Sequence, residues 1–171
     1  MGRLLGTIFI LCGSAGCLFS WWENERKKQK FMEECVRLFA LWSYAVEKEH
    51  MRLYDFLENY ETKWDEMKEL LLDLKQMLSE NRYASGNEAW QEVLFLHKKQ
   101  LPLKGESYRI LEMAADTFFG NSSMESLRCA GICRKRMEEE LSAYRKEYVA
   151  KQKVYMPLGM MGGLVLVIFL L

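Results

Sequence analysis

Two cysteines, Cys129 and Cys133, have the spacing of residues that could hold a metal or exchange electrons. They lie four residues apart, so a helix would present both thiols on one face. A structural zinc site needs four ligands, and cysteine-rich sites usually draw them from two such pairs. The sequence contains no second pair. We therefore expect these thiols to pack as small apolar groups between helices, with no bound metal and no cofactor.

Other groups that could support catalysis are few. The sequence holds two histidines, and it lacks a phosphate-binding Gly-Lys-Ser/Thr loop, a His-Glu-x-x-His motif and a Gly-x-Ser-x-Gly motif. His50 lies in a charged stretch typical of a solvated surface, and His97 lies near a helix end, where a cation is stabilised by the helix dipole. Carboxylates alternate with bases in RKRMEEELSAYRKEY, which is typical of a solvated helix. We expect no catalytic residue and no enzymatic activity.

The elements that would position these residues are helices. Apolar residues recur at intervals of three and four, the repeat of an amphipathic helix, and period-two alternation is absent. The clearest series comprises Phe31, Cys35, Leu38, Phe39, Trp42 and Val46. A second comprises Met67, Leu70, Leu71, Leu74, Met77 and Leu78, and shorter ones include Trp90, Val93 and Leu94, and Ile110, Leu111, Ala114, Ala115 and Phe118. We predict an all-α fold with a bundle of about five or six helices.

Three short stretches separate these helices. They are residues 81–87 (NRYASGN), 101–105 (LPLKG) and 120–123 (GNSS). In the last of them, Ser122 or Ser123 is placed to cap the following helix. That helix contains no proline before Pro157, so it can continue toward the C-terminal end of the chain.

The charged residues divide the chain into three parts. Residues 1–22 hold one charge, Arg3, and residues 154–171 hold none, so 23 basic and 24 acidic side chains lie within residues 23–153. Nearly balanced charge, with no basic stripe interleaved with aromatics, argues against a nucleic-acid partner. We predict a transmembrane helix at 1–22, a helical domain at 23–153 and a second transmembrane helix at 154–171.

The apolar ends have the length that a bilayer requires. Residues 4–22 run for 19 residues without a charge, roughly 28 Å as a helix. The alternative for this segment is a signal peptide or lipoprotein signal, because SAGC around Cys17 loosely resembles a lipidation box. Basic residues cluster beside both apolar ends, on the side of the middle domain. By the positive-inside rule, we expect a two-pass protein with its middle domain in the cytoplasm.

Glycines recur within both predicted spans. Small residues three or four apart let helix backbones approach closely, and this spacing favours Gly6, Gly13, Gly159 and Gly163 as packing sites. The alternative is that glycine is simply common in membrane helices. The sequence leaves the oligomeric state open.

Four stretches carry a resemblance to a known family. They are RLLGTIFILCGS at 3–14, HMRLYDFL around Leu53, the FFG turn at 118–120 and KVYMPLGMMGGLVLVIFLL at 153–171. On these residues the chain resembles, over its full length, the stage III sporulation protein AB family of endospore-forming bacteria. The family usually shows an acidic residue and then a glutamine shortly after this turn. Here Phe119 and Gly120 are followed by Ser122 and Ser123, and no glutamine follows in the next turn.

The resemblance implies a component of the channel complex between the mother cell and the engulfed forespore, in the mother-cell membrane that forms the outer forespore membrane. It also implies that the helical domain is similar to the cytoplasmic domains of the platform proteins of type II secretion and type IV pilus machines. The implied partners are the lipid bilayer, the sporulation channel proteins and a cytoplasmic secretion-type ATPase. Phe119 and Gly120 are implied to form the turn before the last helix.

The sequence is also compatible with a second function, of a different class. The aromatic residues of the middle domain also suit a membrane-anchored sensor or regulatory module that binds a small ligand. Such a module needs an apolar pocket with a few convergent polar groups. Its stability should respond to metabolites, whereas that of a platform should respond to its protein partner.

Overall fold

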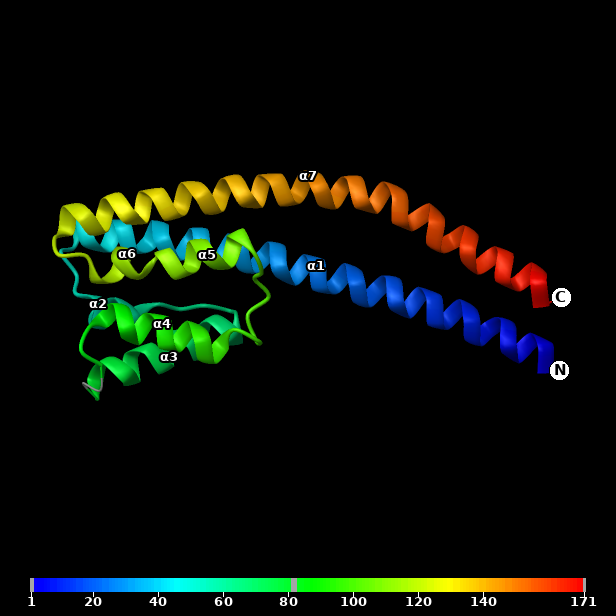
Figure 1. The fold of residues 1–171 in the computed structure, drawn as a ribbon, viewed down its shortest axis with the longest axis horizontal. Helices are drawn as coiled ribbons and strands as arrows, with labels where there is room; N and C mark the ends of the chain where they lie inside the picture. Colours follow the sequence, from blue (N-terminus) through cyan, green and yellow to red (C-terminus); the bar gives the residue numbers. More distant parts are fainter. Residues whose placement is uncertain (1, 81–82, 171) are drawn as a thin grey trace. The chain divides into compact units, whose positions relative to one another are not determined.

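The computed structural model describes the backbone of residues 2–80 and 83–170, and the side chains of residues 22–80, 83–154 and a few positions nearer the ends (Figure 1). This part of the chain is all α-helix and connecting turns, which confirms the predicted fold class. The helices are α1 (Gly2–Lys48), α2 (Leu53–Asn59), α3 (Asp65–Ser79), α4 (Gly86–His97), α5 (Glu106–Met113), α6 (Ala115–Phe119) and α7 (Ser123–Leu170).

The chain forms two compact units. The central unit is Lys30–Leu141, and the terminal unit joins the residues up to Gln29 with those from Ser142 onward. Helices α1 and α7 each contribute to both units, and α7 contains Pro157 without an interruption in its helical assignment. The predicted continuation of the last helix past the middle domain is therefore confirmed.

The core of the central unit is built from the apolar series of the sequence. All six members of the first series are buried on α1, and Met67, Leu70, Leu71 and Leu74 are buried on α3. Helix α7 adds Ala130, Met137 and Leu141, which are also buried. Full burial of one large apolar side chain contributes roughly 1.5–3 kcal/mol. These faces hold the helices together, while ion pairs such as Arg134 with Glu138 (3.6 Å) lie on the exposed side of α7.

Capping side chains fix the starts of α4 and α7. Ser122 Oγ accepts a hydrogen bond from the Glu125 backbone N–H (3.2 Å), and the Glu125 carboxylate accepts one from the Asn121 N–H (3.1 Å). This arrangement resembles a capping box, except that the carboxylate bonds the N–H of the residue before the cap, and it confirms Ser122 as the predicted cap. Ser85 and Glu88 form the same arrangement at the start of α4.

The predicted membrane spans fall mostly on residues whose side chains lie outside the described set. Their backbone is helical, as part of α1 and α7. Among the described residues, no helix combines the length and apolar character that a membrane crossing requires. The two spans stay predictions.

Candidate functional site

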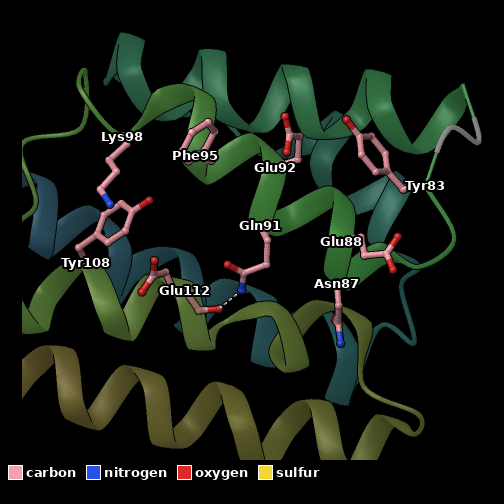
Figure 2. Close-up of a pocket in the computed structure, with 9 residues that line it drawn as sticks. All are labelled: Tyr83, Asn87, Glu88, Gln91, Glu92, Phe95, Lys98, Tyr108 and Glu112. Carbon is pink, nitrogen blue, oxygen red and sulfur yellow. Dashed lines mark hydrogen bonds between the residues drawn. The ribbon is translucent and has the colours of Figure 1, made fainter.

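A groove of about 650 Å³ lies along α4 and α5 in the central unit (Figure 2). Its lining comprises Tyr83, Asn87, Glu88, Gln91, Glu92, Phe95, Lys98, Tyr108 and Glu112. Most of these residues come from α4 and the turn that follows it, and Tyr108 and Glu112 come from α5. The groove was not predictable from the sequence, because the helical repeat identifies buried faces and most of these residues lie off them.

Three hydrogen bonds hold α5 against α4 and fix the floor of the groove. Tyr108 Oη donates to the Leu94 carbonyl (3.1 Å). Gln91 Nε2 donates to the Glu112 carbonyl (3.1 Å), which Figure 2 marks with a dashed line. Trp90 Nε1 donates to the Leu111 carbonyl (2.9 Å). Burial raises the pKa of Tyr108, and the nearby Glu112 charge adds to that effect. The phenol therefore stays a neutral donor. The three hydrogen bonds hold together the two helices that line the groove.

The exposed side of α4 carries apolar side chains. Phe95 is 69% exposed and lines the groove, and its neighbour Leu96 is 55% exposed. Exposed aromatic residues beside a polar groove are typical of protein–protein contact sites. The pair could have been found in the sequence, since Phe95 and Leu96 continue an apolar run beyond the buried face of Trp90, Val93 and Leu94.

The chemistry of the groove suits binding. It offers three carboxylates, one ammonium group, two amides and aromatic rings, and it contains no histidine, cysteine or serine side chain. Within the described residues, no group of three or more histidine, cysteine or acidic side chains could hold a metal ion.

The turn residues implied by the family resemblance lie between α6 and α7. Phe119 ends α6 and Gly120 is its C-cap. A Cβ on Gly120 would lie 2.8 Å from the Asp116 carbonyl oxygen and 3.2 Å from the Ser126 nitrogen, so the backbone approaches too closely for a side chain. The Phe119 ring occupies the space beside Gly86, where a Cβ would come within 2.0 Å of it. This contact connects the turn to the start of α4.

A buried hydrogen-bond network supports the same turn. Trp42 Nε1 on α1 donates to the Thr117 carbonyl (2.7 Å) and to Ser126 Oγ (3.0 Å), and Ser126 Oγ also donates to the Thr117 carbonyl. Thr117 and Ser126 are both buried. Satisfied polar groups in a core favour one arrangement of the elements that carry them. The network therefore fixes α6 and the start of α7 against α1.

Three of the five cysteines and both histidines lie in the central unit. Cys133 is buried and accepts a hydrogen bond from Thr117 Oγ1 (3.7 Å), and burial raises the pKa of both Cys35 and Cys133. His50 is exposed, as expected. His97 is the last residue of α4 and is buried, with Nε2 2.8 Å from the Asp73 carboxylate of α3 and Nδ1 2.7 Å from Gln100 Oε1. It joins α3 to α4, a contact that the sequence alone did not reveal.

The glycines proposed for membrane packing are mostly outside the described side chains. This applies to Gly6, Gly159 and Gly163. At Gly13, which is described, nothing lies within 4 Å of the position that a Cβ would take. Packing at these four positions stays a prediction.

The fold and the groove together define an all-helical protein with a groove on α4 and α5 that opens to solvent. The sequence model of one family, Stage III sporulation protein AB, matches residues 3–171. The chain therefore belongs to the Stage III sporulation protein AB family, which implies a role in stage III of sporulation and is not a known enzyme family. No curated protein and no solved structure matches the chain.

Proposed function

We propose that the protein is a non-enzymatic platform in the membrane, part of the channel complex between mother cell and forespore, and that its central unit docks a cytoplasmic ATPase. The observation that carries the proposal is the family match over residues 3–171. The groove on α4 and α5, with Phe95 exposed beside it, supports a docking role for the central unit.

The proposed location is the mother-cell membrane that surrounds the forespore. Two spans hold the protein there and leave the middle domain in the cytoplasm, where a soluble ATPase can reach it. Support for this comes from the charge distribution, with a single charge in residues 1–22 and none in 154–171. A sensor of small ligands would need an enclosed apolar pocket, whereas the groove described above opens to solvent and carries four charged side chains.

Deletion of the gene is expected to block sporulation after engulfment has begun and to leave vegetative growth normal. The reason is that a platform of the forespore channel has no task before engulfment. Counts of heat-resistant spores, with fluorescence microscopy of the engulfing membrane, measure the effect. A complemented strain is the control. Wild-type spore yield in the deletion strain would contradict the proposal.

Gly159→Leu and Gly163→Leu are expected to weaken assembly with the membrane partners while leaving insertion intact. A leucine at a small-residue contact keeps two helix backbones apart. Co-purification of channel proteins measures assembly, and resistance to carbonate extraction measures insertion. Val165→Leu, at an exposed position of the same helix, is the matched control. Unchanged co-purification with both glycine variants would remove these positions as packing sites.

A further inference from the structure

A second pocket, of about 600 Å³, adjoins the groove on α4 and α5. It lies where the turn after α4 leads into α5, and it shares Lys98, Tyr108 and Glu112 with the groove. The two hollows therefore lie next to each other. A ligand longer than a single small molecule can contact both of them.

The lining of this pocket is strongly basic. Four cations, Lys98, Lys99, Lys104 and Arg109, face a single carboxylate, that of Glu112. The whole chain has 24 basic and 24 acidic side chains, so this is a local excess of positive charge. Like charges around one hollow repel one another, and an anionic ligand removes that repulsion.

Partners within the chain neutralise little of this charge. Lys99 and Lys104 form no ion pair with any residue that the structure describes. Arg109 pairs with Glu106 across 3.9 Å, and both side chains are more than half exposed, at 75% and 52%. Lys98 Nζ lies 5.2 Å from the centre of the Tyr108 ring, which leaves its charge in place. An exposed ion pair of this kind contributes little.

The segment that carries the cations is held in place. Leu101 and Leu103 are buried at 3% and 2% exposure and form the apolar part of the lining. The Leu101 N–H donates to the His97 carbonyl (3.0 Å), and Ser107 Oγ donates to the Lys104 carbonyl (3.0 Å). Because the backbone is fixed on both sides, a ligand need not order this segment, and only the side chains of the basic residues lose freedom on binding.

We propose that this basic pocket receives an acidic segment of the protein that docks on the central unit. Carboxylates of that segment pair with Lys99, Lys104 and Arg109, and an adjoining apolar side chain contacts Phe95 in the groove. The inference rests on the proposed function, since it takes the docked partner to be the cytoplasmic ATPase.

The neighbouring groove argues for a short acidic segment over a continuous polyanion. It carries Glu88, Glu92 and Glu112 next to the basic pocket. A nucleic-acid backbone or an anionic lipid surface would meet these carboxylates and be repelled by them. An acidic segment of limited length places its charge in the pocket and its apolar residue on the groove.

The test uses the full chain in lipid nanodiscs and the purified secretion-type ATPase that is proposed as its partner. Lys99→Glu/Lys104→Glu reverses two charges of the pocket. Lys63→Glu/Lys68→Glu makes the same change in charge at exposed positions outside both hollows and is the matched control. The Kd is measured by microscale thermophoresis for all three proteins, at low salt and with added sodium chloride. Circular dichroism verifies that each variant is folded.

The expected result is a Kd about tenfold weaker for the pocket variant, with the control within about twofold of the wild type. Added salt should weaken the wild type more than the pocket variant. Equal affinity of the pocket variant and the wild type would overturn the inference and leave the platform proposal intact. Displacement of the ATPase by inorganic phosphate at constant ionic strength would overturn it in favour of a free-anion site. Absence of wild-type binding would overturn the docking proposal, and this inference with it.

Discussion

Trp42→Ala is expected to lower the free energy of unfolding of the central unit by about 4 kcal/mol, the cost typical of removing a buried tryptophan. Trp42 is 4% exposed, and its ring packs against Phe56 and Phe118 at centroid distances of 5.1 Å and 5.7 Å. Its indole N–H also bonds the Thr117 carbonyl and Ser126 Oγ. The substitution removes packing and leaves both buried partners without this donor. Urea unfolding of the full chain, followed by circular dichroism, measures the loss.

Trp42→Phe gives an intermediate case. It keeps an aromatic ring in the core but removes the hydrogen-bond donor together with part of the indole volume, so a loss of about 2–3 kcal/mol, smaller than that of Trp42→Ala, is expected. Tyr44→Ala, at a position on the same helix that is 57% exposed, is the control for a general effect on α1 and should change stability by less than about 0.5 kcal/mol. A loss for Trp42→Ala no larger than that of the control would contradict the role given to the buried network.

Gly120→Ala is expected to destabilise the central unit by about 2 kcal/mol. The added methyl group would lie 2.8 Å from the Asp116 carbonyl oxygen, and that neighbour is backbone, which cannot rotate away. The turn must then open, which displaces Ser126 from its bonds with Trp42 and Thr117. Thermal unfolding of the full chain should show a lower Tm.

Gly131→Ala provides a matched comparison. Gly131 is an exposed residue of α7, and nothing lies within 4 Å of the position that its Cβ would take. Alanine is favoured over glycine in a helix by about 1 kcal/mol, so this variant should be as stable as the wild type or more stable. If Gly120→Ala and Gly131→Ala destabilised the protein equally, the close contact with the Asp116 carbonyl oxygen would not be the reason that the turn requires glycine.

The helices and their buried faces were predictable from the sequence because one physical rule governs both. A residue every three or four positions lies on one side of a helix, and burial of that side drives folding. The series from Phe31 to Val46 therefore identified the buried side of α1 correctly. At the other end of the same helix, residues 4–22 were correctly predicted to be helical, while their place in a membrane stays a prediction.

The short helix α2 and the candidate site were not predictable in this way. Helix α2 is seven residues long, too short to show a helical repeat, and Phe56 and Leu57 are buried on it. The Phe56 ring packs against Trp42 of α1. The groove depends on which surfaces of α4 and α5 face each other. Two hydrogen bonds determine this, one between residues 14 positions apart in the chain and one between residues 21 positions apart. The need for glycine at Gly86 likewise comes from Phe119, which lies far along the chain. Helical repeats contain no information about such pairings.

Topology tests the central claim most directly, because only a cytoplasmic central unit can dock a cytoplasmic ATPase. Lys63→Cys introduces a thiol at an exposed position of the central unit. The variant is expressed in vegetative cells, where it inserts into the plasma membrane, and is treated with a membrane-impermeant maleimide before or after lysis. If the central unit is cytoplasmic, this cysteine is labelled only in the sample treated after lysis. Labelling of the same cysteine in intact cells would place the central unit outside the cytoplasm and contradict the account.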